Sequence, residues 1–210
     1  MSFSNKPRWI EWAKKIQSIA QTGLHYSNSE FDRQRYEQLN QIAAEIFAEQ
    51  TEYSFKKIKN TFDNQTGHAT PRIDVRGAAF KDNKVLLVRE TSDEKWTLPG
   101  GWADPFETLS ESIEREFFEE TGYKVKLKKI VAIYDRDKRG HFPPHPYHVY
   151  KIFGICEIID GKPAISFETD AIEFFDINKL PALSSGRINE FEIIKCYEHY
   201  LNPEKPTESD

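Results

Sequence analysis

The chain has 210 residues, of which 38% are hydrophobic, and this composition excludes a disordered protein and allows a sizeable core. Its formal net charge of −5 argues against a strong general affinity for nucleic acid or for anionic membranes. We find no apolar run of about 18 residues and no signal peptide, so we expect a cytoplasmic protein. Cys156 and Cys196 lie in apolar segments without the spacing of a disulfide framework or a metal site, which predicts two buried thiols.

Residues 1–66 are predicted to form a helical domain. Its expected helices are residues 7–22, a second helix opened by Ser27 and Glu30 at capping-box spacing, and a weaker one at residues 53–62. Gly23 should end the first helix, which carries Trp9 and Trp12 on its apolar stripe. Such a small domain cannot bury its apolar stripes within itself, so it must pack against a second copy of the chain or against the domain that follows it. We predict a homodimer in which these helices form much of the interface.

Residues 67–203 are predicted to form an α/β domain. Apolar runs predict strands at residues 72–80, 84–89, 124–134, 148–158 and 172–175. A last helix should follow Ser184 and Ser185. Residues 204–210 are charged and contain a proline, which predicts a disordered tail.

A glycine turn and a helix stand out between these strands. The turn is Thr97–Gly101, where two glycines allow positive φ angles and a close backbone approach to a ligand. Leu109, Ile113 and Phe117 then recur every four residues on one side of a predicted helix, which Gly122 should end.

Carboxylates gather on another face of the same predicted helix. Glu116, Glu119 and Glu120 stand at i, i+3 and i+4, and Glu107 precedes the helix closely enough to fold back towards them. Two carboxylates about 5 Å apart repel by roughly 3 kcal/mol at an effective dielectric near 20, so such a cluster requires cations or raised pKa values. Oxygen ligands without Cys or His suit Mg²⁺ or Mn²⁺. The alternative is a solvated acidic face, which would leave the glycine turn and the helix stop as coincidences.

The stretch resembles the Nudix box, Gly-x5-Glu-x7-Arg-Glu-U-x-Glu-Glu-x-Gly-U, in which U is a bulky apolar residue. The matching residues are Gly101, Glu107, Arg115, Glu116, Phe117, Glu119, Glu120, Gly122 and Tyr123. The resemblance implies a Nudix hydrolase, with an α/β/α sandwich built on a mixed sheet and cleavage of a phosphoanhydride bond. A helical piece of about 70 residues before the box also resembles a Gram-positive bacterial subgroup, which hydrolyses nucleoside diphosphates linked to another group.

The resemblance also implies roles for the residues of the box. Glu119 and Glu120 match the principal metal ligands, and Glu116 matches a carboxylate that binds metal or accepts the proton of the attacking water. The carbonyl of Gly100 is a further ligand in many members of the family. Arg115 is expected to orient the carboxylates, with Glu107 and Gly101 as supporting residues.

A further acid usually comes from a loop near the end of a Nudix domain. The candidates are Glu168, Asp170 and Glu173. Glu173, directly before an aromatic pair, best matches the usual metal-binding position, and Glu168 is the alternative as a general base. For each of them an ordinary surface acid is about as good an interpretation.

Substrate selection is predicted in residues 135–148, a proline-rich and histidine-rich loop. Lys138 or Arg139 could pair with a phosphate, and Phe142 or Tyr147 could stack on a base. Arg76, in the first strand, is another candidate for substrate binding. A choline group would need an aromatic cage, to which Trp96, Trp102 and Phe106 could contribute. The alternative for His141, His145 and His148 is a zinc site, which their irregular spacing disfavours.

These residues predict a Mg²⁺- or Mn²⁺-dependent pyrophosphohydrolase that cuts a nucleoside diphosphate linked to X into a nucleoside monophosphate and phospho-X. CDP-choline, giving CMP and phosphocholine, is the first expectation, and ADP-ribose, giving AMP and ribose 5-phosphate, is the second. The alternative from another class is a catalytically silent Nudix-fold ligand sensor. The complete Nudix box disfavours this alternative, because Nudix-fold proteins that have lost catalysis usually lack residues of the box.

Overall fold

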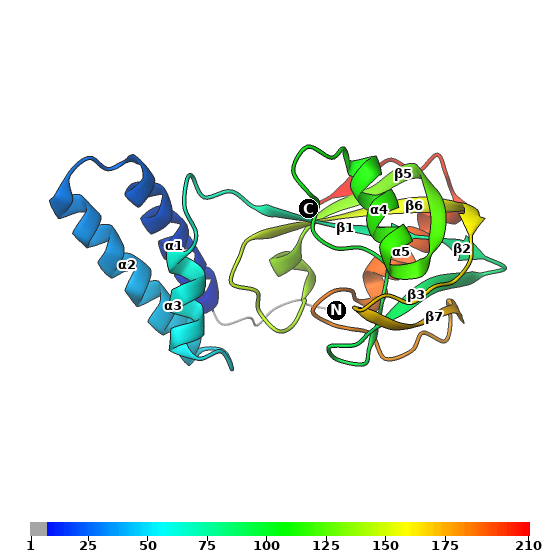
Figure 1. Ribbon diagram of the computed structural model, residues 1–210, viewed down its shortest axis with the longest axis horizontal. Helices are drawn as coiled ribbons and strands as arrows, with labels where there is room; N and C mark the ends of the chain where they lie inside the picture. The colour runs from blue at the N-terminus through cyan, green and yellow to red at the C-terminus, as the bar shows by residue number, and fades with distance from the viewer. Residues whose placement is uncertain (1–7) are drawn as a thin grey trace. The chain divides into compact units, whose positions relative to one another are not determined.

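The computed structural model describes residues 8–210, which divide into two compact units (Figure 1). One unit contains the chain up to Pro71 together with Phe142–His148, and the other contains Arg72–His141 and Val149–Asp210. The boundary thus falls a few residues after the predicted one at 66. Residues 1–7 of the predicted helical domain lie outside the described residues. Within 8–210, no helix is long and apolar enough to cross a membrane.

The first unit is built from three helices, as predicted: α1 (Arg8–Tyr26), α2 (Glu30–Glu49) and α3 (Phe55–Asp63). Its core contains Ile10, Ala13, Ala43, Ala44, Phe47, Ile58 and Phe62. The two tryptophans of α1 stay outside this core, since Trp9 is 53% exposed and Trp12 is 39% exposed. Their rings pack edge to face with centroids 4.9 Å apart. The helical unit therefore presents a paired aromatic surface that its own residues do not cover.

Two local predictions in this unit are wrong. Gly23 does not end α1, which runs on to Tyr26. A Cβ at Gly23 would lie 2.4 Å from the ring of Tyr36 in α2, so this glycine allows α1 and α2 to approach closely. The cap of α2 is Ser29 instead of Ser27, because the Ser29 side chain accepts the hydrogen bond from the Asp32 amide.

The second unit contains two sheets. The first has the order β1 (Arg72–Ala78), β6 (Val149–Gly161), β5 (Tyr123–Asp135) and β8 (Glu208–Ser209), with β1 parallel to β6 and β5 antiparallel to β6. In the second, β3 (Lys84–Glu90) pairs with β2 (Phe80–Lys81), β4 (Trp96–Thr97) and β7 (Thr169–Asp176). The remaining elements are α4 (Leu109–Thr121), the short 3-10 helix η1 (Arg136–Arg139) and α5 (Glu190–Leu201).

Residues of β6 alternate between two buried clusters, and this shows how the helices cover the first sheet. Ile152 and Cys156 belong to a buried cluster with residues of α4, whereas Phe153 and Ile155 belong to a cluster with residues of α5. Because neighbouring strand residues point to opposite faces, α4 and α5 lie on opposite sides of the sheet. The predicted α/β/α sandwich with a mixed sheet is confirmed.

Residues 142–148 pack with the helical unit, although they lie within the sequence of the second unit. Lys14 of α1 donates a hydrogen bond from Nζ to the carbonyl of Tyr147 at 2.7 Å. Phe142, Pro143 and Pro144 line a cleft together with residues 49–53, which follow α2. This part of the predicted substrate loop is therefore bound to the N-terminal helices.

The prediction of a disordered tail at residues 204–210 is wrong. Glu208 and Ser209 form β8, which pairs with β5. The Glu208 carboxylate accepts hydrogen bonds from the Tyr134 hydroxyl at 2.9 Å and from Lys205 at 3.0 Å, and Asp210 forms an ion pair with Arg139 at 2.7 Å. Charged residues favour disorder only when they lack partners, and these partners lie on distant strands and turns.

We expect removal of residues 204–210 to destabilise the second unit, because it removes β8 and leaves the hydroxyl of the buried Tyr134 without its acceptor. The melting temperature should fall by several degrees, since about 1 kcal/mol corresponds to roughly 2–4 °C in a chain of this size. Glu204→Gln is the matched control, because Glu204 is exposed in the same tail. Equal melting temperatures for the truncated chain and the control would contradict this assignment.

Candidate active site

The turn at Leu98–Gly101 is fixed to the edge of β1 by main-chain and side-chain hydrogen bonds. These are Val75 N–H to Gly101 O at 2.8 Å, Gly77 N–H to Pro99 O at 2.9 Å, and Arg76 Nη1 to Leu98 O at 3.1 Å. Gly100 has φ +144°, and a Cβ there would lie 2.0 Å from the carbonyl oxygen of Val75. Only glycine fits, as the turn predicted.

Helix α4 carries the acidic residues towards this turn. It begins with a capping box in which Thr108 and Glu111 bind each other's main-chain amides, and it ends at Gly122 in the left-handed conformation, as predicted. Ile113 and Phe117 are buried in the core, which fixes the rotation of the helix about its axis. A Cβ at Gly101 would lie 2.7 Å from Glu116 Oε2, so the carboxylate of Glu116 packs against the glycine turn.

Arg115 joins the carboxylates at the exposed side of the site. Its Nε and Nη2 donate to Glu107 at 2.8 and 3.0 Å, and its Nη1 donates to Glu116 at 2.8 Å and to Glu119 at 3.1 Å. Asp104 lies 3.4 Å from Nη2. The structure thus brings Arg115 and Glu107 together in the arrangement that their expected supporting roles require.

Glu120 is the most deeply placed acid of the box. It is 5% exposed, and its Oε2 accepts a hydrogen bond from Gly100 N–H at 3.0 Å. Burial raises the pKa of Glu120 to about 8, against the opposing effects of the Arg76 charge and the Gly100 amide. Burial also raises the pKa of Glu116 above its usual value, although Arg115 opposes the shift. Two neighbouring carboxylates therefore lie where their negative charge is poorly compensated.

Arg76 does not present its guanidinium to a substrate, contrary to the prediction. The side chain is buried, and its Nε and Nη2 donate to the two carboxylate oxygens of Asp74 at 3.0 and 2.9 Å. Lys151, also buried, binds Asp74 from the other side. Because Arg76 also binds Leu98 O, it holds the glycine turn from behind and acts as a buried counter-charge for Glu120.

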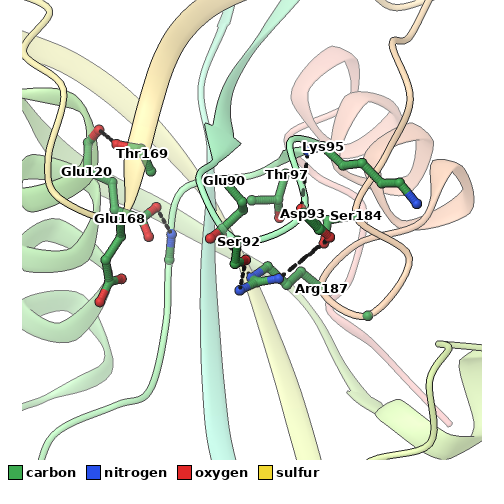
Figure 2. A network of polar contacts seen from close by, with 12 residues as sticks. Glu90, Ser92, Asp93, Lys95, Thr97, Glu120, Glu168, Thr169, Ser184 and Arg187 are labelled. Atoms are coloured by element: carbon green, nitrogen blue, oxygen red, sulfur yellow. Dashed lines mark hydrogen bonds and ion pairs between the residues drawn. The ribbon is translucent and has the colours of Figure 1, made fainter. Parts of the chain in front are cut away.

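Glu168 is brought to the same region. Its carbonyl accepts a hydrogen bond from Thr91 N–H at 2.9 Å, and the hydroxyl of the next residue, Thr169, donates to Glu120 O at 3.0 Å. Figure 2 shows Glu168 beside Glu120, with Glu90 next to them. The side chain of Glu168 is exposed, so a water molecule can reach its carboxylate.

Glu173, the preferred candidate for a further ligand, is not brought to the site. Ile172 and Phe174, its neighbours along β7, pack into the cluster that contains α4, so the side chain of Glu173 points to the opposite face of the strand. It is exposed there, near Arg89. Asp170 is also engaged elsewhere, as it accepts two hydrogen bonds from Arg89 at 2.7 and 3.0 Å.

The predicted phosphate-binding residues of η1 differ in their environment. Lys138 is exposed. Arg139 is already engaged, because its guanidinium lies 3.8 Å from the centroid of the Tyr134 ring and forms the ion pair with Asp210. Its observed contacts anchor the C-terminal segment, so they do not support binding of a phosphate.

The predicted aromatic residues do not assemble into one cage. Trp96 packs edge to face on Phe175 in the core, with centroids 4.5 Å apart, and Phe106 is fully exposed. Trp102 is 42% exposed and has the guanidinium of Arg72 5.9 Å from its ring centroid. The other two candidates, Phe142 and Tyr147, belong to the helical unit.

His141 is held as a structural residue. It is completely buried, with Nε2 2.7 Å from Glu192 Oε1 and Nδ1 3.1 Å from Ser185 O. His145 Nδ1 accepts a hydrogen bond from Tyr147 N–H at 3.2 Å. Both ring nitrogens of His141 have partners, so it is not poised to bind zinc.

The box carboxylates fit a hard divalent cation by their chemistry. Glu116, Glu119, Glu120 and the Gly100 carbonyl supply only oxygen atoms. Burial raises the pKa values of Glu116 and Glu120, so a cation bound there would stabilise their ionised forms. As placed, no three Asp, Glu, His or Cys side chains among residues 8–210 converge closely enough to hold a metal ion. Arg115, which binds Glu116 and Glu119, would have to share them with the cation.

Comparison with protein families agrees with this geometry. Residues 70–195 match the NUDIX domain. The chain belongs to the Nudix family. It is a Nudix pyrophosphohydrolase, and Nudix hydrolases generally need a divalent metal. Residues 7–62 match a second family model, described as a UDP-X-like, N-terminal oligomerisation domain.

Individual relatives cover most of the chain. YjhB of Bacillus subtilis, which carries the provisional name ADP-ribose pyrophosphatase, is 38% identical over 95% of this chain and 96% of its own length. A crystal structure of a UDP-X diphosphatase covers 96% of this chain and 98% of its own, with a TM-score of 0.63 and 28% identity. An ADP-ribose pyrophosphatase from Streptococcus suis covers 67% of this chain and 100% of its own, with a TM-score of 0.61 and 34% identity.

Glu90 is a residue of the site region that the sequence did not suggest. It is the last residue of β3, is 5% exposed, and forms an ion pair with Arg187 Nε at 2.9 Å. Burial raises its pKa, and the charge of Glu168 raises it further. An acid directly after the apolar run of β3 is the one signal that could have drawn attention to it.

We expect Glu120→Gln to lower the hydrolysis rate by about 100-fold or more, because loss of a metal ligand should exceed the 10–100-fold effect typical of supporting partners. Its effect on stability should depend on pH in the metal-free protein. The pKa of Glu120 is about 8 in the folded chain against 4.5 as its ordinary value. The wild type should therefore lose stability as pH rises from about 4.5 to 8.

The melting temperature of Glu120→Gln in EDTA should consequently rise relative to wild type between pH 5 and pH 9. Glu119→Gln is the matched variant, because Glu119 is an exposed acid one residue away. It should lose activity without this pH-dependent gain in stability. Normal activity in either variant, or an equal pH dependence in both, would contradict the assignment.

Proposed function

We propose that this Nudix pyrophosphohydrolase cleaves a nucleoside diphosphate linked to a second group, with ADP-ribose as the leading substrate and Mg²⁺ or Mn²⁺ as the cofactor. The observation that carries the proposed chemistry is the pair of poorly compensated acids, Glu116 and Glu120, packed against the glycine turn. Support for the substrate comes from relatives named for ADP-ribose over nearly the whole chain or its Nudix domain.

In this proposal Glu116, Glu119, Glu120 and the Gly100 carbonyl hold the metal ion. The ion, when bound, neutralises diphosphate charge and helps to position the attacking water. Arg115 keeps two of these acids in place through its fork of hydrogen bonds, and Glu107 orients Arg115. Glu173 has no part in the reaction, because it faces away from the site.

Glu168 is the proposed general base. It accepts the proton of a water molecule whose oxygen bonds to one phosphorus atom, while the bond from that phosphorus to the bridging oxygen breaks. With ADP-ribose the products are AMP and ribose 5-phosphate. The exposed carboxylate is carried on a segment that is anchored to Glu120 through Thr169 and to the β3–β4 turn through Thr91, so the main chain of Glu168 is fixed relative to the box.

CDP-choline becomes the second choice in this proposal. The aromatic residues considered for a choline cage are divided between the core and exposed positions. The face of Trp102 already has the cation of Arg72 near it. A catalytically silent sensor is disfavoured, because the acids, the glycine turn and Arg115 all occupy mutually consistent positions.

A substrate panel tests the proposal directly. It contains ADP-ribose, CDP-choline, UDP-glucose, ADP-glucose, NADH, a dinucleoside polyphosphate and 8-oxo-dGTP, each with Mg²⁺ and with Mn²⁺. We expect the highest kcat/KM for ADP-ribose, with AMP as a product, and no turnover in EDTA. A preference for CDP-choline or UDP-glucose would keep the chemistry and change the second group. A preference for 8-oxo-dGTP would overturn the substrate class, and no turnover at all would support the sensor.

We also propose that the chain is a homodimer joined through its N-terminal helices. The exposed pair Trp9 and Trp12 supports this, as does the match of residues 7–62 to an oligomerisation domain. Light scattering should give twice the mass of one chain at micromolar concentration. Replacing both tryptophans with alanine should shift the mass towards one chain, whereas Ile159→Ala, at an exposed position of the Nudix domain, should not. A single-chain mass for the wild type would contradict the proposal.

A further inference from the structure

Arg187 lies close to Glu90 (Figure 2). Its partners differ from those of Arg76 and Arg115, the other two arginines near the box. Arg187 precedes α5, and its Nε forms an ion pair with the buried carboxylate of Glu90 at 2.9 Å. Its terminal nitrogens bind neutral hydroxyl groups: Nη1 donates to Ser184 Oγ at 3.3 Å and Nη2 to Ser92 Oγ at 3.2 Å. Asp93 is more distant from Nη1, at 3.8 Å.

The partners of the three arginines near the box differ in how easily a phosphate could replace them. Arg76 is buried, and carboxylate and carbonyl groups occupy its fork. Arg115 directs Nε, Nη1 and Nη2 at carboxylates of the box. The Arg187 side chain is 35% exposed and forms a close ion pair with Glu90 through Nε and a longer one, at 3.8 Å, from Nη1 to Asp93. The hydrogen bonds of Nη1 and Nη2 go to serine hydroxyl groups. Phosphate oxygens are stronger acceptors for a guanidinium than hydroxyl groups are, so its Nη1 and Nη2 can exchange partners.

Glu90 connects this arginine to the box. Its carboxylate is 6% exposed, and it interacts electrostatically with both Arg187 and Glu120. Figure 2 shows Glu90 lying between these two residues. The ion pair with Glu90 and the hydrogen bonds to Ser184 and Ser92 together hold the guanidinium in place before any ligand arrives. Ser184 is itself tied down, since its hydroxyl donates to Asp93 at 2.7 Å.

We propose that Arg187 is a substrate-binding residue, which binds non-bridging oxygens of the diphosphate through Nη1 and Nη2 while Glu90 positions it through Nε. This assignment rests on the proposed function, since the diphosphate has to reach Arg187 while the box carboxylates hold the metal ion. The ligand class is a diphosphate dianion with any attached groups. Arg187 contributes to binding of the substrate both before and during the reaction, so its loss acts on KM.

The test compares Arg187→Gln, Arg187→Lys and Arg89→Gln. Arg89 is the matched control, because it is also a partly exposed arginine of the same unit, but its fork binds Asp170. Arg187→Gln should raise KM for the best substrate of the panel by about 10- to 100-fold, the range expected for lost charged hydrogen bonds. Its kcat should stay within about threefold. Arg187→Lys should be intermediate, and Arg89→Gln should match wild type.

Two measurements separate binding from a purely structural effect. The KM of the wild type should rise more steeply with salt than that of Arg187→Gln, because the variant has lost one cationic contact to phosphate. The dissociation constant of α,β-methylene-ADP with Mg²⁺, measured by calorimetry, should rise in the same order as KM. A merely structural role would lower the melting temperature and leave the salt dependence unchanged.

The outcomes distinguish this inference from the proposed function. Wild-type hydrolysis of a nucleoside diphosphate with an unchanged KM and salt dependence in Arg187→Gln would overturn the assignment of Arg187 alone. If the wild type neither hydrolyses any substrate of the panel nor binds α,β-methylene-ADP, the proposed function and the assignment both fall. Binding without hydrolysis, weakened in Arg187→Gln but not in Arg89→Gln, would support Arg187 and refute the enzymatic proposal.

Discussion

The hydrogen bond from Gly100 N–H to Glu120 is the contact on which the rest of the site depends. It joins two segments that the fold supports independently, a turn fixed to β1 and a helix fixed by its buried face. A side chain at Gly100 would collide with β1, so the turn could not come so close with another residue. The buried amide in turn gives the Glu120 carboxylate a donor where little water remains to supply one.

This arrangement buries acidic groups, which is unfavourable when they are ionised. Cationic side chains surround them, some buried and others partly exposed. Asp74, Arg76 and Lys151 form a buried group behind the turn. Burial alone would raise the pKa of Asp74, yet Arg76 and Lys151 hold it below its usual value. From this group the charge of Arg76 opposes the rise in the pKa of Glu120 and so favours its ionised form.

Arg115 and Arg187 are more exposed than this buried group. The donors of Arg115 are occupied by carboxylates, whereas Nη1 and Nη2 of Arg187 are available to a ligand. Arg115 has most of its hydrogen bonds on the box carboxylates and joins them to one another. Arg187 forms its close ion pair with Glu90 through Nε, and its Nη1 and Nη2 bind serine hydroxyl groups, which a phosphate can replace. The two arginines differ because more carboxylates lie within hydrogen-bonding distance of Arg115 than of Arg187, and a guanidinium binds carboxylates more strongly than neutral acceptors.

The parts of the site that the sequence predicted are those encoded locally. The spacing of Glu116, Glu119 and Glu120 on one helix, the turn before them and the stop at Gly122 all involve residues close in the chain. The contacts of Arg76 and Arg139 do not support their predicted roles in substrate binding, and the partners responsible are distant in sequence. Lys151, which completes the buried group of Arg76, comes from β6, and Asp210, which occupies Arg139, comes from the tail.

The same reason explains the misjudged helix end and tail. Gly23 has the local signature of a helix stop, but the ring of Tyr36 from α2 packs where its side chain would be and the helix continues. Residues 204–210 have a composition typical of disorder, and the strand β5 supplies the hydrogen bonds that order them. In both cases a tertiary contact overrides the local preference.

The assignment of residues 142–148 to the helical unit means that no single cut separates the two units. The chain passes between them after Pro71, after His141 and after His148. Lys14 binds the carbonyl of Tyr147, so a chain truncated at Arg72 would lose the donor for that carbonyl and the partners of the neighbouring prolines. Effects of removing the helices on catalysis would therefore include the disturbance of this segment. Point substitutions at Trp9 and Trp12 avoid that difficulty, because both side chains are exposed and leave the Lys14 contact in place.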